Sequence, residues 1–526
     1  MFRSPHGEIT LPAQSLTDFV LDAGRGQTRQ AALVDGITGR AVTYGELREQ
    51  VRRTAAGLAA LGIRKGDVVA LCAPNSPEFA VAFHAAARLG ATVTPANPAS
   101  TAHELAHQLR DAGAKMLIAG TAIIDKARVA ISESRQAIEL IVTNEPPPGV
   151  RSLAAIARDV DPPSITIDPA TDIVALPYSS GTTGLPKGVM LTHRNLVANI
   201  VQLESVERPG LRAFVAVLPF FHIYGLVVIL NFGLRCGTTI VTLPRFEPES
   251  FLKALQDWRI ELAHIVPPMA VALAKHPAVQ NYDLRHLETM FSGAAPLGPS
   301  VTEAVEQRLS VVVKQGYGMT EASPVTHYSD FQGAVRPGTV GRLVPSTECR
   351  IVDVESGRDA GVGEPGEVWI RGPQVMLGYL NNIEATARTL DSEGWLHTGD
   401  IGTVDSDGYL TIVDRLKELI KVKGYQVAPA ELEALLLKHP QIADAAVIPA
   451  AHEECGEVPK ALVVARGNLT ADEVIAFVHA QVAHYKRIHQ VAFVDAIPKS
   501  ASGKILRRVL VAQERSAAGA STHAGA

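Results

Sequence analysis

Residues 178–189 read YSSGTTGLPKGV, and this stretch is the most informative part of the sequence for the fold. The eleven positions from Ser179 to Val189 hold four hydroxyl side chains, three glycines and one lysine. Glycines let backbone amides approach an anion closely, hydroxyls add hydrogen-bond donors, and the lysine adds charge. We therefore interpret the stretch as a loop that binds polyphosphate, and not as a surface turn rich in Gly and Ser.

The loop differs from a Walker A loop, which needs glycine directly before the lysine and Ser or Thr directly after it. Here Pro186 precedes Lys187 and Gly188 follows it. Strand-like residues flank the loop at 173–177 and 189–191, and Thr192 is placed to cap a helix. We therefore expect a loop between two strands.

Strand and helix patterns alternate along most of the chain. Helical spacing of apolar residues predicts helices at 44–61 and 77–89, with short apolar strands at 67–73 and 92–95. This rhythm is typical of parallel sheets covered by helices. After about residue 340 strands predominate, and from Asp414 the pattern is that of a small α+β unit.

The predicted fold class is therefore α/β, in two domains. A length of 526 residues exceeds one ordinary domain. We expect a large N-terminal domain (1–413) of parallel βαβ layers with a β-rich subdomain. A small mobile α+β domain (414–526) follows it.

Composition narrows the class of protein. With 49 basic and 54 acidic residues the net charge is −5, which gives no general reason to expect nucleic-acid binding. The uncharged run 213–234 contains Pro219, His222 and Gly225, so we expect a buried soluble element and not a transmembrane helix. Four widely spaced cysteines and an N-terminus without an apolar signal core predict a cytoplasmic protein. The oligomeric state stays open.

Further segments follow the loop in a fixed order. They are SGAAPL (292–297), QGYGMTE (315–321), GEVWIRG (366–372), WLHTGD (395–400), DRLKELIKVKGYQ (414–426) and SGKILRR (502–508). Together with the loop they resemble the acyl-adenylate-forming superfamily of acyl-CoA synthetases, luciferases and peptide-synthetase adenylation domains. The resemblance covers nearly the whole chain, and it implies ATP, Mg²⁺ and coenzyme A as cofactor and cosubstrates.

The resemblance also implies an ATP/AMP site. Its residues are Ser179, Ser180, Gly181, Thr182, Thr183, Gly184, Lys187, Ala295, Gln315, Gly316, Tyr317, Gly318, Thr320, Asp400, Arg415, Gln426 and Lys504. Tyr317 offers an aromatic face to adenine, and Asp400 accepts hydrogen bonds from the ribose hydroxyls with Arg415 as its helper. Glu321 falls at the magnesium position, where an oxygen ligand suits a hard cation.

Catalytic roles by resemblance fall to Lys504 and His222. A mobile ammonium at Lys504 neutralises charge on the α-phosphate during adenylation, and His222 contacts the carboxylate or gates the thiol. The small domain is expected to swing about a hinge at Asp414 between the two half-reactions. Lys421, Lys423 and Gly424 then help to form the coenzyme A tunnel.

Among subfamilies the chain most resembles 4-coumarate–CoA ligase. The acyl pocket implied by this resemblance comprises His222, Tyr224, Met290, Gly293, Gly316, Gly318, Pro324 and Val325. Small and apolar residues around one tyrosine suit a flat aromatic ring. Tyr224 either stacks on the ring, hydrogen-bonds a phenolic hydroxyl, or packs in the core. One departure is Trp369, where the plant enzymes carry a cysteine.

The predicted function is an ATP-dependent carboxylate–CoA ligase that acts through an acyl-adenylate, with a 4-coumarate or cinnamate-type acid as substrate. The alternative is a medium-chain or other fatty acyl-CoA ligase, which shares every nucleotide residue. A peptide-synthetase adenylation domain binds an α-amine through an acid, and FFHIYG (220–225) contains none. A pseudoenzyme scaffold is disfavoured because Lys187, Glu321, Asp400, Arg415 and Lys504 all remain.

Overall fold

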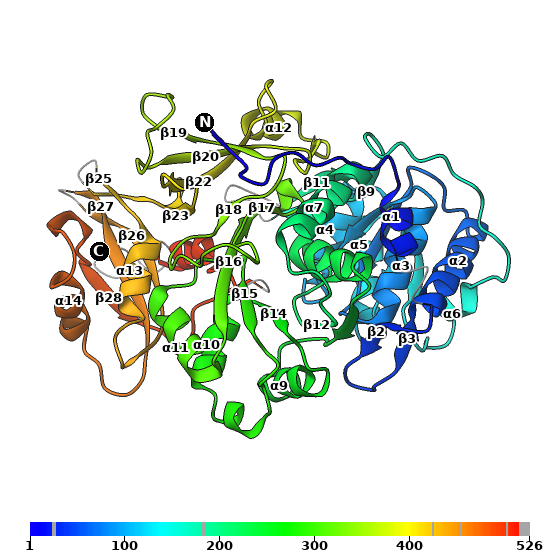
Figure 1. Ribbon diagram of the computed structural model, residues 1–526, viewed down its shortest axis with the longest axis horizontal. Helices are drawn as coiled ribbons and strands as arrows, with labels where there is room; N and C mark the ends of the chain where they lie inside the picture. Colours follow the sequence, from blue (N-terminus) through cyan, green and yellow to red (C-terminus); the bar gives the residue numbers. More distant parts are fainter. Residues whose placement is uncertain (24–27, 180–185, 423–424, 453–454, 501–502, 515–526) are drawn as a thin grey trace, which may run out of the picture.

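The computed structural model describes residues 1–23, 28–179, 186–422, 425–452, 455–500 and 503–514 (Figure 1). Sheets and helices alternate through the large domain, and a small unit lies at one end of the molecule beside α10 (Pro267–Lys275) and α11 (Pro299–Leu309). The predicted α/β fold is confirmed. The division at Asp414 remains a prediction.

The first sheet of the large domain is mostly parallel and carries the predicted phosphate loop at one edge. Its strands, in spatial order, are β10 (Tyr178–Ser179), β11 (Lys187–Thr192), β9 (Ile173–Ala175), β5 (Thr92–Pro95), β4 (Val68–Cys72), β6 (Ala114–Ala119), β7 (Glu139–Val142) and β8 (Arg151–Ser152). The short strand β21 (Gly378–Tyr379) pairs with β11. Interior strands such as β4 are continuously apolar because helices cover both faces.

Two further sheets complete the α/β part. The second runs β12 (Ala213–Ala216), β13 (Thr239–Thr242), β2 (Ala31–Asp35), β3 (Ala41–Thr43). The third runs β14 (Leu262–Ile265), β15 (Thr289–Ser292), β16 (Val312–Gly318), β17 (Val325–Tyr328), β18 (Arg342–Leu343). Because β14, β15 and β16 are parallel, their carboxyl ends meet at one edge, where ligands bind in open α/β sheets.

Helices pack between and around these sheets. The remaining α-helices of the large domain are α1 (Leu16–Ala23), α2 (Tyr44–Ala60), α3 (Pro77–Arg88), α4 (Ala102–Asp111), α5 (Ile124–Ser134), α6 (Leu153–Ile156), α7 (His193–Val206), α8 (Phe232–Arg235), α9 (Pro248–Asp257) and α12 (Ile383–Thr389). Local sequence signals set several starts: Thr43, Thr101 and Thr192 each form a capping box.

The β-rich part that the sequence predicts after residue 340 is an antiparallel sheet. Its order is β1 (Phe2–Arg3), β19 (Glu348–Val352), β20 (Gly366–Arg371), β22 (Leu396–Val404), β23 (Leu410–Arg415). Trp369 on β20 stacks on His397 with ring centroids 3.7 Å apart, and its Nε1 donates to Glu367 over 2.9 Å. Trp369 thus packs within this sheet.

The small unit has its own apolar core and its own sheet. The strands are β25 (Tyr425–Val427), β24 (Ile420–Val422), β27 (Gly456–Ala465) and β26 (Ile442–His452), with β28 (Gln490–Phe493) beside β27. Helices α13 (Pro429–Leu436) and α14 (Ala471–His479) cover it, and residues 507–514 form a last helical segment. Ala434 of α13 approaches Gly298 at the start of α11, where an ideal Cβ on the glycine would lie 3.8 Å from the alanine Cβ.

The uncharged run 213–234 folds as β12 followed by a buried π-helix, Tyr224–Asn231. Gly225 has no room for a side chain, since an ideal Cβ would lie 2.2 Å from the Pro219 carbonyl oxygen. Among the described residues, helices long and apolar enough to cross a bilayer do not occur.

Candidate functional site

The predicted phosphate loop joins two strands, as expected. β10 and β11 pair antiparallel with Ser179 opposite Lys187, and Thr192 caps α7 through a reciprocal pair with Asn195. The structure therefore places both ends of the loop. The predicted phosphate ligands that lie outside the described residues are Ser180, Gly181, Thr182, Thr183 and Gly184.

Lys187 and Glu321 meet around Tyr379. The Lys187 Nζ lies 4.2 Å from the centroid of the Tyr379 ring, and the Tyr379 hydroxyl donates to Glu321 Oε1 over 2.8 Å. Burial lowers the pKa of Lys187, while Glu321 acts in the opposite direction. Sequence reasoning did not single out Tyr379, because a Gly-Tyr pair in a short strand carries no chemical signal by itself.

Glu321 is 4% exposed and lies in the short 3₁₀ turn Thr320–Ala322, just after β16. Groups of three or more His, Cys, Asp or Glu side chains able to hold a metal are absent from the part of the chain that the structure describes. A single carboxylate beside a phosphate loop nevertheless fits Mg²⁺, which keeps several waters and shares its shell with substrate phosphates. Thr320 sits in the same turn.

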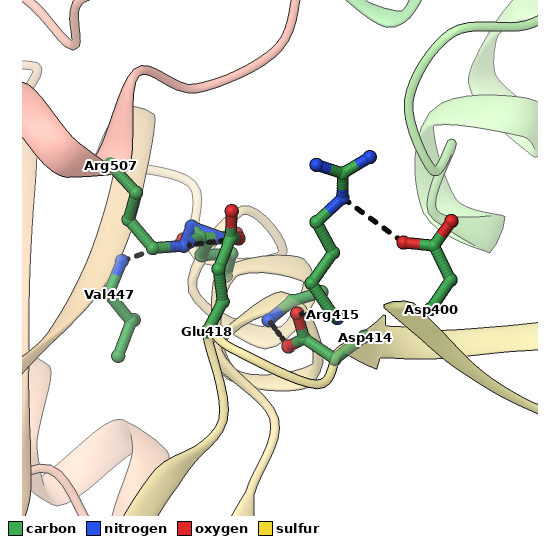
Figure 2. A network of polar contacts seen from close by, with 8 residues as sticks. Asp400, Asp414, Arg415, Glu418, Val447 and Arg507 are labelled. Carbon is green, nitrogen blue, oxygen red and sulfur yellow. Dashed lines mark hydrogen bonds and ion pairs between the residues drawn. The ribbon is translucent and has the colours of Figure 1, made fainter. Parts of the chain in front are cut away.

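The predicted ribose residues lie together at the junction of β22 and β23. Asp400 and Arg415 are register partners, and Arg415 Nε lies 3.1 Å from Asp400 Oδ1 (Figure 2). The Tyr317 hydroxyl donates to the other oxygen of Asp400 over 2.5 Å. Burial and the Asp400 carboxylate raise the pKa of Tyr317 well above its usual range, so the phenol stays protonated. Asp400 therefore contacts both other side chains, Tyr317 through one oxygen and Arg415 through the other.

Gln315 holds the neighbouring loop that carries Ala295. Its side-chain oxygen accepts from the Leu297 amide over 3.2 Å, and its side-chain nitrogen donates to the Leu297 carbonyl over 3.4 Å. Gln315 therefore ties β16 to the loop at residues 293–297, which contains Ala295.

Lys504 belongs to the small unit, and charged groups of the large unit act on its pKa. Burial lowers the pKa of Lys504, and the Arg415 guanidinium lowers it further. The carboxylates of Asp400, Glu321 and Glu418 act in the opposite direction. The lysine is thus within electrostatic reach of both the ribose pair and the predicted magnesium ligand.

The loop of Lys504 is seated on the large unit at the end of β14. An ideal Cβ on Gly503 would lie 2.8 Å from Pro268 Cδ, so only glycine fits there. Ser500 closes the loop by accepting from the Lys504 amide through its hydroxyl over 3.1 Å. The adenylation residue predicted from sequence therefore reaches the site in this orientation of the small unit.

His222 faces the same charge. Its pKa is lowered to about 4, first by burial and then by Lys504, so the ring is neutral at pH 7. Nδ1 accepts a hydrogen bond from the Tyr224 amide over 3.3 Å, which places the ring proton on Nε2. A neutral imidazole with a fixed N–H donor suits contact with a carboxylate oxygen.

Tyr224 is anchored at the predicted acyl pocket. Its hydroxyl lies 3.3 Å from the Phe291 carbonyl oxygen and 3.3 Å from His264 Nδ1. The Tyr224 ring covers Gly293, where an ideal Cβ would lie 2.8 Å from Tyr224 Cε1. This explains why glycine follows β15.

Met290 and its neighbour Phe291 lie on opposite faces of β15. Consecutive residues of β15 point to opposite faces, and the contacts with Gly316 belong to Phe291, whose Cε1 lies 2.9 Å from an ideal Cβ on that glycine. Met290 is fully buried. Phe291 is therefore a pocket candidate that sequence reasoning missed.

Gly318, Pro324 and Val325 form a close backbone contact. An ideal Cβ on Gly318 would lie 2.1 Å from the Pro324 carbonyl oxygen, and Asn199 accepts from the Val325 amide over 3.1 Å. Glycine is required at 318 by this approach, whatever the ligand.

His264, also missed, is 1% exposed, and its Nε2 has no hydrogen-bond partner within the described residues. Burial lowers its pKa to about 3, so it is neutral. The only sequence signal was a single histidine in an apolar strand.

The predicted coenzyme A residues are only partly described. Lys421 on β24 is exposed, and its amide donates to Glu457 over 2.9 Å. Gln426 is its register partner on β25. Lys423, Gly424 and the side chain of Gln426 lie outside the described residues.

Asp414, the predicted hinge, contacts both β22 of the large unit and α13 of the small unit. Its backbone pairs with Ile401 of β22, while its carboxylate accepts from the Ala430 amide in the first turn of α13 over 3.0 Å. Burial raises the pKa of Asp414.

Comparison with known proteins identifies the fold and the family. The fold is that of the acyl-CoA synthetases and adenylation domains: the anthranilate–CoA ligase AuaEII in complex with anthranoyl-AMP superposes with a TM-score of 0.88 at 27% identity, over 97% of this chain and 99% of that one. Residues 21–380 match the AMP-binding enzyme family and residues 431–504 its C-terminal domain, so the chain belongs to that family. The superfamily prediction is confirmed.

Two further comparisons are informative. A 4-coumarate–CoA ligase of Oryza sativa subsp. japonica is 44% identical over 98% of this chain and 97% of its own length. MatB from Rhodopseudomonas palustris, 30% identical over 94% of this chain and 98% of its own, superposes with a TM-score of 0.86 in its ATP-bound crystal structure and 0.76 in its apo structure.

Proposed function

We propose that this chain is an ATP-dependent, AMP-forming acid–CoA ligase whose substrate is an aryl acid of the 4-coumarate or cinnamate type. The observation that carries the proposal is the convergence of Lys187, Glu321, Asp400, Arg415 and Lys504 on one junction, in a chain 44% identical over nearly its whole length to a 4-coumarate–CoA ligase. The acid is joined first to AMP and then to coenzyme A.

In the first half-reaction a carboxylate oxygen of the acid forms a bond to the α-phosphorus of ATP, and pyrophosphate leaves. The protein contributes position and charge. Asp400 accepts from the ribose hydroxyls, Lys187 faces the departing phosphates, and Lys504 neutralises charge between the α-phosphate and the carboxylate. His222 donates its Nε2 proton in a hydrogen bond to the carboxylate side.

Glu321 holds Mg²⁺ together with the phosphates in this proposal. When bound, the ion supplies positive charge that offsets the pyrophosphate leaving group. The hydrogen bond from Tyr379 fixes the orientation of the Glu321 carboxylate.

In the second half-reaction the coenzyme A sulfur attacks the acyl carbon, its thiol proton is released, and AMP leaves. The present orientation, with Lys504 seated at the site, serves the first step. The better superposition on ATP-bound than on apo MatB supports this assignment. For the second step the small domain (414–526) turns about Asp414 and brings Lys421, Lys423 and Gly424 to the tunnel.

An aryl acid is favoured over a fatty acid by the predicted pocket. Phe291 and Tyr224 supply aromatic surface, and the His264–Tyr224 pair adds polar atoms that an alkyl chain has no group to satisfy. All four cysteines are free, which supports a cytoplasmic location.

The test is a parallel assay of coenzyme A ligation with cinnamate, 4-coumarate, benzoate and octanoate, with and without Mg²⁺. We expect the highest kcat/KM with an arylpropenoic acid and dependence on the ion. Faster turnover of octanoate contradicts the aryl assignment and favours the fatty acyl-CoA alternative.

A further inference from the structure

Arg507 binds two carboxylates inside the small unit, that of Glu433, which is buried, and that of Glu418, which is partly exposed. Its Nε lies 2.9 Å from Glu418 (Figure 2). Its two terminal nitrogens lie 2.9 and 3.2 Å from the two oxygens of Glu433. Side-chain exposure is 10% for both Arg507 and Glu433. A two-pronged contact of this kind is geometrically specific as well as strong, and lysine cannot reproduce it.

The two carboxylates lie on different elements. Glu433 is on α13 and also accepts from the Val447 amide of β26 over 2.7 Å. Glu418 lies in the turn just after the predicted hinge, where its amide donates to the Arg415 carbonyl over 2.9 Å. One guanidinium therefore joins α13 to the turn that carries Arg415.

Arg507 is also three residues from Lys504, at the start of the helical segment 507–514. The Leu506 amide donates to the Pro498 carbonyl over 2.8 Å and closes the base of the lysine loop. The anchored Arg507 side chain and the base of the lysine loop are therefore adjacent along the chain.

Glu418 is one of three carboxylates whose charge acts on the pKa of Lys504, with Asp400 and Glu321. It is among the groups that raise the pKa of the lysine, so the two charges attract one another. While Glu418 is bound to Arg507, its Oε2 is engaged in that contact. Without Arg507, Glu418 becomes a competing partner that can draw the ammonium away from the nucleotide.

We propose that Arg507 is a positioning residue for the adenylation step, which anchors the Lys504 loop to Glu433 and keeps Glu418 from pairing with Lys504. This rests on the proposed role of Lys504. Since Arg507, Glu418 and Glu433 all follow Asp414, they move as one body, and the thioester step does not need the anchor.

The test measures the two half-reactions separately on the full-length enzyme. Acid-dependent ATP–pyrophosphate exchange reports adenylation, and release of aryl-CoA from supplied aryl-adenylate reports transfer. For Arg507→Met we expect adenylation to fall by about 10²-fold, the size that a misplacement of about 1 Å produces. The KM for ATP and the transfer rate should stay at wild-type values.

The matched control is Arg508→Met, the exposed neighbour, which should keep both rates. Arg507→Lys retains charge but not the forked contact, and its adenylation should fall between wild type and Arg507→Met. If the Tm shows that Arg507→Met does not fold, Arg507→Lys replaces it as the test variant.

The double variant Arg507→Met/Glu418→Gln tests the competition directly. Removing the carboxylate should restore a large part of the adenylation rate lost in Arg507→Met, and equal Tm values for the single and double variants separate this recovery from an effect on folding. Equal loss of both half-reactions, or a double variant as slow as Arg507→Met, overturns the proposal. If wild type itself shows neither half-reaction with any aryl acid, the proposed function fails instead.

Discussion

At the scale of single residues, the reaction centre owes its protonation states to burial. His222 has its pKa lowered to about 4 and is neutral, whereas Lys504 has its pKa lowered by burial and Arg415 but raised by three carboxylates. In the proposed reaction, the pair provides one neutral hydrogen-bond donor and one lysine side chain at the point where the acid meets the α-phosphate.

The first prediction concerns Lys504→Ala. Loss of the ammonium should reduce acid-dependent ATP–pyrophosphate exchange by about 10²–10³-fold, the usual effect of removing one group that stabilises developing charge. Transfer from supplied acyl-adenylate to coenzyme A should be largely unaffected. An equal loss in both assays would show that the lysine is not specific to adenylation.

The second prediction concerns His264→Leu. If Nε2 of His264, which has no partner among the described residues, meets the phenolic hydroxyl, kcat/KM for 4-coumarate should fall by about tenfold relative to cinnamate, which corresponds to about one hydrogen bond. His84→Leu is the matched control. His84 is also buried, its Nε2 also has no partner in the described part of the chain, and its pKa is also lowered to about 3, but it bonds to Thr17 outside the site. The same change of the ratio in both variants, or in neither, contradicts the role.

Sequence alone predicted the charged residues of the site because each lies in an ordered block of residue types. The structure places Lys187 near Glu321 and Asp400 beside Arg415, as the resemblance implied. Phe291 and His264 were missed because only the parity and register of β14 and β15 show which face each side chain occupies. Neither property can be read from one residue.

At the scale of elements, α13 carries an unusual carboxylate. Burial raises the pKa of Glu433 to about 7, which Arg507 and the Val447 amide oppose and Asp414 and Glu418 favour. The folded state therefore binds more protons than the unfolded state between pH 4.5 and 7. This group's contribution to stability is present at low pH and is lost as the pH rises through that window.

The third prediction follows from this sign. Glu433→Gln should make the slope of unfolding free energy against pH more positive between pH 4.5 and 7, by up to about 1.4 kcal/mol per pH unit, the value for one proton. Urea unfolding at several pH values measures the slope. Glu431→Gln, an exposed carboxyl on the same helix, is the control. An unchanged slope in Glu433→Gln would contradict the claim that Glu433 binds an additional proton in the folded state.

Elements with strong local signals were predicted closely, and those that depend on contacts were not. β5 has the predicted bounds and α2 ends one residue before its predicted end. The π-helix Tyr224–Asn231 was predicted only as a buried element, because its wider turns depend on contacts such as the Asn231 side-chain amide donating to the Leu226 carbonyl.

At the scale of the whole molecule, the two units meet in an orientation that seats Lys504 at the site. The contacts between Gly298 and Ala434, and between Gly503 and Pro268, define this orientation. A resemblance could name the hinge, but the orientation of the two units is a property of the folded surfaces and was left open by the sequence.

The fourth prediction tests whether this orientation serves adenylation alone. A Cβ separation of 3.8 Å between Gly298 and Ala434 matches the usual disulfide geometry, and Gly298 has an ordinary φ of −68°. The oxidised Gly298→Cys/Ala434→Cys variant should form adenylate but stall before coenzyme A transfer, and reductant should restore transfer. Each single cysteine variant under the same oxidant is the control. Full aryl-CoA synthesis in the cross-linked enzyme would show that rotation is unnecessary.

The pairing of Asp400 with Arg415 has a consequence for the order of events. These residues form neighbouring rungs with Ile401 and Asp414 in the β22–β23 ladder, so the nucleotide carboxylate and the pivot belong to the same hydrogen-bonded ribbon. In the proposed rotation about Asp414, the neighbouring rung at Arg415 opens and its ion pair with Asp400 breaks. The same motion that admits the thiol would then loosen the proposed contact with the nucleotide, so the proposed rotation couples entry of the thiol to release of AMP.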